Sequence, residues 1–206
     1  MNDQTAEQHS VTVLDVIRGV FRNFPEFAKT HLTGARPPAL IVTVWLLGMD
    51  AVAGAMELEF VQRGDYIVDN WFHAWLRIMG IGILLGTVRY WVVGTLFHGI
   101  VRLAGGHGAM RTSRYIFLYA SVPVVVVDLS FKVFQMLHYG NRYFTGQTNE
   151  ILDGIMAGIM LAVYIYSVRL CYIGMCLLMG ADRLRSVVLI VVIMLAMFGV
   201  VAAVAM

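Results

Sequence analysis

The sequence has 206 residues, of which 59% are hydrophobic and only 14% are charged. Soluble domains carry about 25% charged residues, so this composition excludes a water-soluble globule and predicts a protein whose solvent is lipid. The net charge is only +2, and no run of lysine or arginine residues suggests a nucleic-acid partner.

The first ten residues are predicted to form a disordered tail. They are polar and contain acids, whereas a secretory signal places basic residues directly before a short apolar core. We therefore expect residues 1–10 to carry no cleaved leader and to remain unstructured.

Residues 11–36 are predicted to form an amphipathic helix region on the cytoplasmic surface of the membrane. Apolar side chains from Val13 to Phe27 recur at helical spacing, and charged side chains occupy the opposite face. A soluble helix that docks onto the membrane spans is the alternative interpretation of the same pattern.

Two local signals define this helix further. Thr12 and Asp15 have the spacing of a capping box, which marks a helix start. Pro25 has no backbone N–H to donate, so it predicts a break or kink after Asn23 or Phe24.

Residues 37–206 are predicted to form one membrane domain of five transmembrane helices. Pro37 and Pro38 end the preceding region, since consecutive prolines cannot continue a helix. Each apolar stretch beyond them approaches the length of about 20 residues that crosses the hydrocarbon, and Pro123 is predicted to kink the third span. The predicted spans are residues 39–56, 71–103, 115–137, 151–179 and 187–206. The predicted fold class is therefore an all-α integral membrane protein with five transmembrane helices after an amphipathic interfacial helix.

The distribution of lysine and arginine predicts the orientation. Cytoplasmic segments of membrane proteins carry an excess of these residues, so the amino terminus is expected in the cytoplasm and the carboxy terminus outside. The residues on the basic side are Arg18, Arg22, Lys29, Arg36, Arg102, Arg111, Arg114, Arg183 and Arg185, against Arg63 and Arg142 on the other side.

Two short motifs resemble those of a known membrane family. Gly105 and Gly106 open the sequence GGHGA, and Tyr119 opens the sequence YASVP that ends at Pro123. They resemble the Yip-one (Ypt-interacting protein) family, in which a Gly-Gly-x-Gly/Ser loop precedes a span with a Tyr-Ala-Ser-x-x-Pro-like pattern. Here the proline follows one residue earlier than in that pattern.

The resemblance implies an architecture and a location. The five-span layout and the amphipathic segment look like those of bacterial members, which implies the cytoplasmic (inner) membrane of a bacterium. Eukaryotic relatives act in membrane trafficking and bind Rab-type GTPases. The cytoplasmic amino-terminal region here is shorter than theirs, which argues against a GTPase partner.

Charged residues inside spans cost several kcal/mol unless they are paired or hydrated, so they are the first candidates for a functional site. Asp50, Arg77, Asp128 and Lys132 are expected in the outer half of the membrane, close enough to pair. Asp128 and Lys132 are four residues apart, the spacing of an ion pair along one helix face. The first interpretation is that these charges hold the bundle together. The alternative is a small transporter or channel component in which Asp50 and Asp128 line a water-accessible cavity.

Arginines of the inner half suggest contacts with lipid head groups. Arg89 and Arg169 have no evident acid at their depth, so they are predicted to reach toward phosphates of the cytoplasmic leaflet. Arg102, Arg111 and Arg114 could complete an anionic-lipid site, although the positive-inside rule alone would also place them there.

Other motifs give no indication of chemistry. The sequence shows no phosphate loop, nucleophile elbow or exposed pair of carboxylates, and its histidines lack the spacing of metal ligands, so we expect no enzyme, metal or cofactor. The pairs Gly82/Gly86 and Gly154/Gly158 are expected to serve helix packing. The leading functional prediction is a membrane-organising or accessory protein that acts through membrane lipids and through a membrane-protein partner or a second copy of itself.

Overall fold

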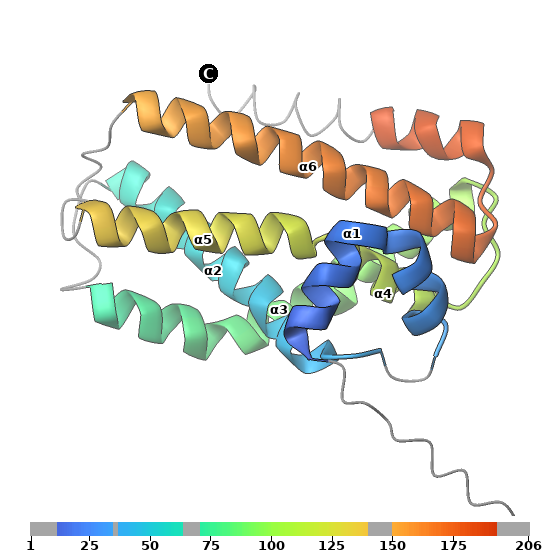
Figure 1. The fold of residues 1–206 in the computed structure, drawn as a ribbon, viewed down its shortest axis with the longest axis horizontal. Coiled ribbons are helices and arrows are strands. Elements are labelled where there is room, and N and C mark those ends of the chain that lie inside the picture. Colours follow the sequence, from blue (N-terminus) through green and yellow to red (C-terminus); the bar gives the residue numbers. More distant parts are fainter. Residues whose placement is uncertain (1–11, 35–36, 64–70, 140–149, 193–206) are drawn as a thin grey trace, which may run out of the picture.

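A computed structural model describes residues 12–34, 37–63, 71–139 and 150–192. These residues form helices and connecting turns without any strand, which confirms the all-α class. Most helices run nearly side by side along the long axis, and the first helix lies across one end (Figure 1). The helices are α1 (Val13–His31), α2 (Leu40–Arg63), α3 (Trp71–Leu103), α4 (Met110–Ala120), α5 (Val122–Tyr139), α6 (Glu150–Met179) and a short helix at 183–192.

Three helices of the described part are long and apolar enough to cross a membrane. They cover Phe72–Leu103, Met110–Tyr139 and Ile151–Met179, and Leu40–Met56 is a shorter apolar helix. The long helices correspond to the second, third and fourth predicted spans. The fifth predicted span continues into residues 193–206, which lie outside the described residues, as does the predicted tail at 1–10.

The third predicted span differs from its expected form in two ways. Its helix begins at Met110, so Arg111 and Arg114 lie on α4 and not in the preceding loop. It is also interrupted at Ser121, between α4 and α5. Pro123 explains the interruption, because a proline cannot donate to the carbonyl four residues earlier.

α1 has the start and the kink that its sequence predicts. The Thr12 and Asp15 side chains cap each other's backbone N–H groups, at 3.3 and 3.0 Å respectively. Asn23 has non-helical backbone angles, two residues before Pro25. The missing N–H of Pro25 leaves the Phe21 carbonyl without its helical donor.

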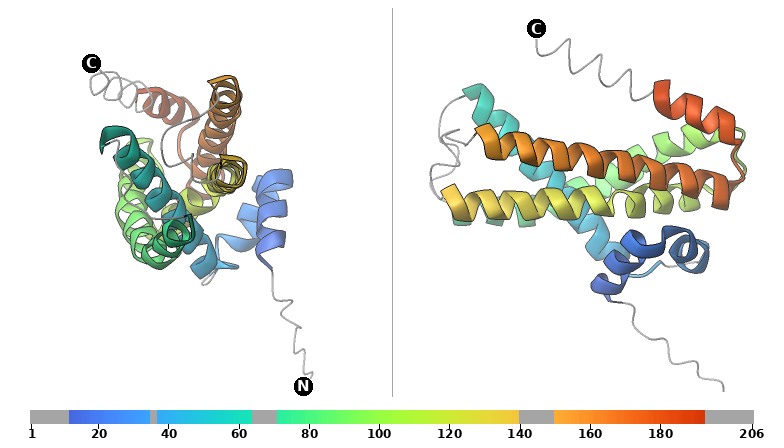
Figure 2. Two further views of the ribbon diagram at one scale, coloured as in Figure 1. Left: turned by 90° about the vertical axis from the view of Figure 1, so that its left-hand side faces the viewer. Right: turned by 45° about the horizontal axis from the view of Figure 1, so that its top comes forward.

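The apolar face of α1 is covered by other helices. Val16, Val20, Phe24 and Ala28 are buried, and α1 contacts α4, α5 and α6. Figure 2 shows α1 against one side of the bundle. The apolar face is therefore directed at protein, as in the docked alternative of the sequence analysis.

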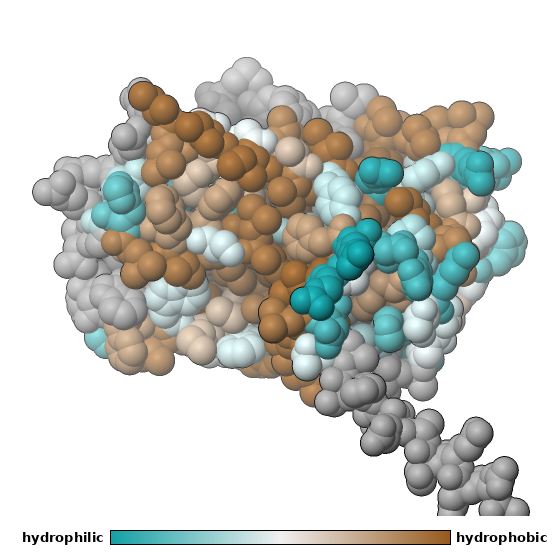
Figure 3. Space-filling view, viewed as in Figure 1, coloured by the Kyte–Doolittle hydropathy of each residue, from teal (hydrophilic) through white to brown (hydrophobic). Residues whose placement is uncertain are grey.

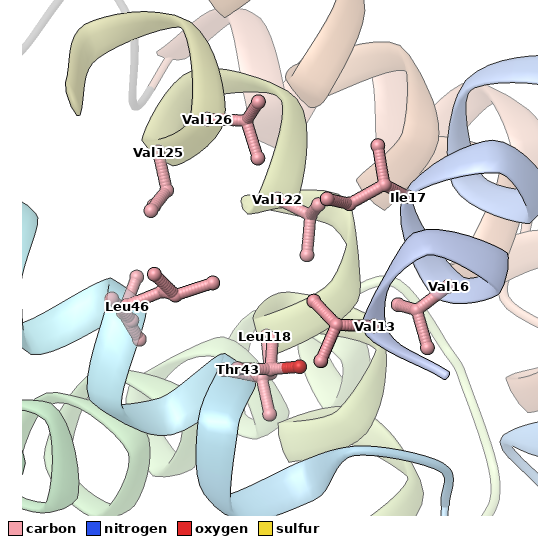
Figure 4. Close-up of a pocket in the computed structure, with 10 residues that line it drawn as sticks. Val13, Val16, Ile17, Thr43, Leu46, Leu118, Val122, Val125 and Val126 are labelled. Carbon is pink, nitrogen blue, oxygen red and sulfur yellow. The ribbon is translucent and has the colours of Figure 1, made fainter. Parts of the chain in front are cut away.

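A narrow apolar cleft lies between α1 and its neighbours. Figure 4 shows Val13 and Ile17 of α1 facing Leu46 of α2 and Val122 and Val126 of α5. Its cavity volume is about 10 Å³, so it has room for no more than a water molecule. The cleft is a packing imperfection and not a ligand site.

Glycines bring α2 and α3 into backbone contact. A Cβ atom added at Gly48 would collide with the backbone of Gly82 and Gly86 on α3, so only glycine fits here. The pair Gly82/Gly86 thus packs internally, as predicted. Gly154 and Gly158 make no such contact within the described residues, where a Cβ at either position would meet nothing within 4 Å.

The surface is divided between apolar and polar regions. Figure 3 shows hydrophobic side chains over α5 and α6 and hydrophilic side chains over α1. Large apolar side chains on α3 and α6 are exposed, among them Leu84, Leu96, Ile151 and Leu161. Such a surface is suited to lipid and not to water.

Candidate functional site

An ion pair joins α2 and α3 midway along the apolar helices. Arg89 Nη1 lies 2.8 Å from Asp50 Oδ2, and the same nitrogen donates to the Leu47 carbonyl at 3.3 Å. The Asp50 side chain is 11% exposed and that of Arg89 is 35% exposed. The carboxylate is therefore largely buried, whereas the guanidinium is partly exposed.

This pair corrects one expectation of the sequence analysis, that Arg89 lacks an acid at its depth. Counting residues from the membrane boundary placed Asp50 and Arg89 in different halves, but the tight glycine contact between α2 and α3 sets a register in which they meet. Arg77 is exposed on the surface of α3.

A second ion pair lies within α5. Lys132 Nζ donates to Asp128 Oδ2 one helical turn earlier, as their spacing predicts. The Lys132 side chain is only 6% exposed. Its ammonium group is thus neutralised inside the bundle.

The two pairs are neighbours and form one charge cluster, defined here as Asp50, Arg89, Asp128 and Lys132. Asp50 and Asp128 interact electrostatically with each other, and Tyr164 of α6 interacts with all four groups. The cluster contains two acids and two bases, so its formal charges cancel. The cluster thus brings together charged side chains of α2, α3 and α5.

The GGHGA sequence forms a structural junction at the carboxy-terminal end of α3. Gly105 has a φ of +79°, a left-handed conformation that ends helices and favours glycine. The N–H groups of Gly105 and Gly106 donate to the last carbonyls of α3, at 3.0 and 2.9 Å. A Cβ at Gly106 would lie 2.6 Å from Val101 Cγ1, so this position is also restricted to glycine.

The same loop is tied to the turn after α6 by two backbone hydrogen bonds. His107 N–H donates to the Met179 carbonyl at 2.7 Å, and Asp182 N–H donates to the Ala104 carbonyl at 2.9 Å. Two loops that are far apart in the sequence therefore form one unit at the end of the bundle.

The YASVP sequence forms a second junction. Tyr119 is fully buried, its hydroxyl donates to the Pro38 carbonyl before α2, and its ring lies 5.5 Å from that of Phe27 on α1. Pro123 is the second residue of α5. Tyr119 thus connects α4 to α1 and to the segment before α2.

Two neighbouring side chains of α6 satisfy the carbonyls of the interrupted helices. Tyr166 donates to the Phe21 carbonyl at the α1 kink at 3.1 Å, and Ser167 donates to the Ala120 carbonyl at the α4–α5 break at 2.6 Å. Sequence reasoning missed both contacts, because they depend on which helices are neighbours.

The five arginines suggested for lipid binding do not gather at one place. Arg102, Arg111 and Arg114 lie near the connection between α3 and α4, whereas Arg169 is exposed on α6 and Arg89 belongs to the charge cluster. Arg111 donates to the Gly34 carbonyl at 3.3 Å.

His98 links three helices beside Arg102. Arg102 Nε donates to His98 Nε2 at 3.4 Å. His98 Nδ1 and Ser113 Oγ share a hydrogen bond of 2.8 Å, and the Ser113 hydroxyl points at the sulfur of Met179 at 3.9 Å.

These features define an all-helical membrane protein whose first helix packs on the bundle and whose loops form two structural junctions. Within the described residues no group of three or more His, Cys, Asp or Glu side chains could hold a metal ion. The sequence model of the Yip1 domain matches residues 19–206, and the chain belongs to the Yip1 domain family. No match was found among curated proteins or solved structures.

Proposed function

We propose that this chain is a non-enzymatic accessory protein of the membrane, which acts through contacts with lipids and with a membrane-protein partner. The observation that carries the proposal is the internal pairing of the charge cluster. Charges that serve transport are exposed to a water-filled path, whereas Asp50 and Asp128 each contact a base.

The described pockets support the same conclusion. Neither the cleft beside α1 nor the apolar groove of about 320 Å³ between α5 and α6 is lined by a residue of the charge cluster. The groove is lined by apolar side chains alone, such as Phe131, Phe134 and Ile159. We attribute these ion pairs to helix packing and not to transport.

The proposed arrangement in the membrane has five spans and a cytoplasmic amino terminus. Three long helices and the shorter Leu40–Met56 supply four apolar segments, and the apolar sequence at 187–206 supplies the fifth. The excess of lysine and arginine in the amino-terminal segment, on the helix ends that flank the α3–α4 loop and at the start of the helix at 183–192 supports this orientation. A bacterial inner membrane is the proposed location.

The outer surface of α1 supports a position at the membrane boundary. Leu14 and Phe21 are exposed while the rest of the apolar face is buried in the bundle. Exposed apolar side chains beside a basic face are typical of helices at the head-group level. We therefore place α1 where the bundle, the cytoplasm and the lipid head groups meet.

The test is a flux assay on the purified protein in liposomes. Proteoliposomes with an imposed proton or potassium gradient are compared with protein-free liposomes, and Asp50→Asn and Asp128→Asn proteins are measured beside the wild type. We expect the same leak from all four samples. A flux that the wild type supports and either substitution abolishes would replace the accessory role with transport.

A further inference from the structure

We propose that the seam between α3 and α4 is a binding site for the phosphate of an anionic phospholipid in the cytoplasmic leaflet, with Arg114 as its central contact. The α3–α4 seam is defined here as Trp91, Thr95, His98 and Arg102 of α3 together with Met110, Ser113 and Arg114 of α4. This inference rests on the proposed function, because it assigns one lipid contact of the accessory role.

The seam is a continuous stripe on each helix. Its four residues on α3 are separated by four, three and four positions, so they lie along one helix face. Residues 110, 113 and 114 of α4 have the same helical spacing. Hydrogen bonds join the two faces, since Arg114 Nη2 donates to Thr95 Oγ1 at 3.0 Å and His98 contacts Ser113 at 2.8 Å.

Arg114 is held in place at this seam without an acid. Its guanidinium carbon lies 3.9 Å from the centre of the Trp91 ring, which is a cation–π contact. Among the described residues no carboxylate contacts Arg114, and its Nε atom is buried without a hydrogen-bond partner. Arg89 has Asp50, whereas Arg114 has no carboxylate to balance its charge among the described residues.

The location fits a lipid phosphate. Arg114 is the fifth residue of α4, about one helical turn from the connection between α3 and α4, and the orientation proposed above places this end of the bundle in the cytoplasmic leaflet. Trp91, Val92 and Leu96 are exposed beside it on α3, and they offer an apolar surface to acyl chains. Arg102 is seven residues beyond Thr95 on α3, about 10 Å at 1.5 Å per residue. At this position it can contact the outer part of a head group.

Gly94 permits this arrangement. A Cβ atom at Gly94 would lie 2.8 Å from Arg114 Cγ and 3.2 Å from Arg114 Cβ. Arg114 therefore crosses α3 directly over a glycine, and any larger residue would push the guanidinium away from Trp91. Gly99 lies in the same helix, and a Cβ there would meet nothing within 4 Å.

The experiment measures lipid retention by native mass spectrometry. The protein is reconstituted in nanodiscs of phosphatidylcholine with a minority of phosphatidylglycerol, and the lipid that remains bound after transfer to mild detergent is counted. We expect the wild type to retain phosphatidylglycerol selectively. Arg114→Gln should weaken this retention about tenfold, equivalent to about 1.4 kcal/mol, and Arg169→Gln, which removes an exposed arginine of α6, should not.

Gly94→Ala and Gly99→Ala provide a second matched pair if Arg114→Gln fails to fold. Gly94→Ala keeps every charge but displaces Arg114, so retention should fall, whereas Gly99→Ala should behave as the wild type. Equal retention by Arg114→Gln and Arg169→Gln, or by the two glycine variants, would overturn the proposal.

Inorganic phosphate distinguishes a lipid site from a site for a free anion. We expect an excess of inorganic phosphate to leave the bound phosphatidylglycerol in place, because the free ion has no acyl chains to contact α3. Full displacement would overturn the assignment to a lipid. Lipid retention tests the site, and the flux assay tests the accessory role. Because the two measurements are independent, the failure of one proposal can be told from the failure of the other.

Discussion

Arg89 and Asp50 form an ion pair of 2.8 Å although they are 39 positions apart in the sequence. The pair joins α2 and α3 next to the stretch where Gly48, Gly82 and Gly86 hold the two backbones in contact. The glycines therefore set the register, and the ion pair removes the cost of two charges inside the apolar part of the bundle.

Removing one partner of this pair should destabilise the protein. Arg89→Gln leaves the Asp50 carboxylate largely buried without its cation, and we expect a loss of about 2 kcal/mol in the free energy of unfolding. The measurement is unfolding by sodium dodecyl sulfate in mixed micelles. The double variant Asp50→Asn, Arg89→Gln should lose less free energy of unfolding than the sum of the losses in the two single variants. If the losses simply add, the two groups do not interact.

The close approach of α2 and α3 should tolerate no side chain at Gly48. Gly48→Ala introduces a Cβ into the backbone of α3, and the helices must separate at a cost of about 3 kcal/mol. Gly54→Ala is the control on the same helix, because a Cβ there meets nothing within 4 Å. Thermal unfolding midpoints of the two variants in one detergent provide the comparison. Equal midpoints would exclude the tight glycine contact.

The Tyr166 hydroxyl should hold α1 against the bundle. Tyr166→Phe leaves the Phe21 carbonyl at the kink without this donor, so we expect a loss of about 1 kcal/mol and faster proteolysis or hydrogen exchange within α1. Tyr164→Phe removes a hydroxyl two residues away that donates to no described residue of α1. Both variants should expose α1 equally if the hydroxyl of Tyr166 plays no part.

Gly106 should be required for the contact between the two loops. In Gly106→Ala the new Cβ meets Val101 Cγ1 at 2.6 Å and the Val101 carbonyl oxygen at 2.9 Å, so the loop must move. The backbone N–H groups of His107 and Asp182 report on the loop contact, since each donates across it. We expect faster hydrogen exchange at both amides in Gly106→Ala and not in Gly99→Ala. Unchanged exchange at both would contradict this role of the motif.

Features that depend on neighbouring residues in the chain were predictable from the sequence. The α1 kink follows from the missing N–H of Pro25, and the Asp128–Lys132 pair follows from a spacing of four. The long apolar stretches gave the bounds of α3 and α6 to within one residue. Each of these signals lies within one helix.

Features that depend on the register between helices were not predictable. The partner of Asp50 was assigned by counting residues from the membrane boundary, a method that ignores the offset between α2 and α3. The cation–π contact of Arg114 with Trp91 required knowing that α3 and α4 are neighbours. The spacing of Trp91, Thr95, His98 and Arg102 on one face of α3 was the signal in the sequence that could have suggested the α3–α4 seam.

The most direct test of the accessory role is to identify what accompanies the protein in its own membrane. The protein is expressed at its native level and extracted directly into polymer-bounded nanodiscs, and every co-purifying protein and lipid is quantified by mass spectrometry. We expect a stoichiometric membrane-protein partner together with enriched anionic phospholipid. A solitary protein surrounded by lipid of the bulk composition would contradict it.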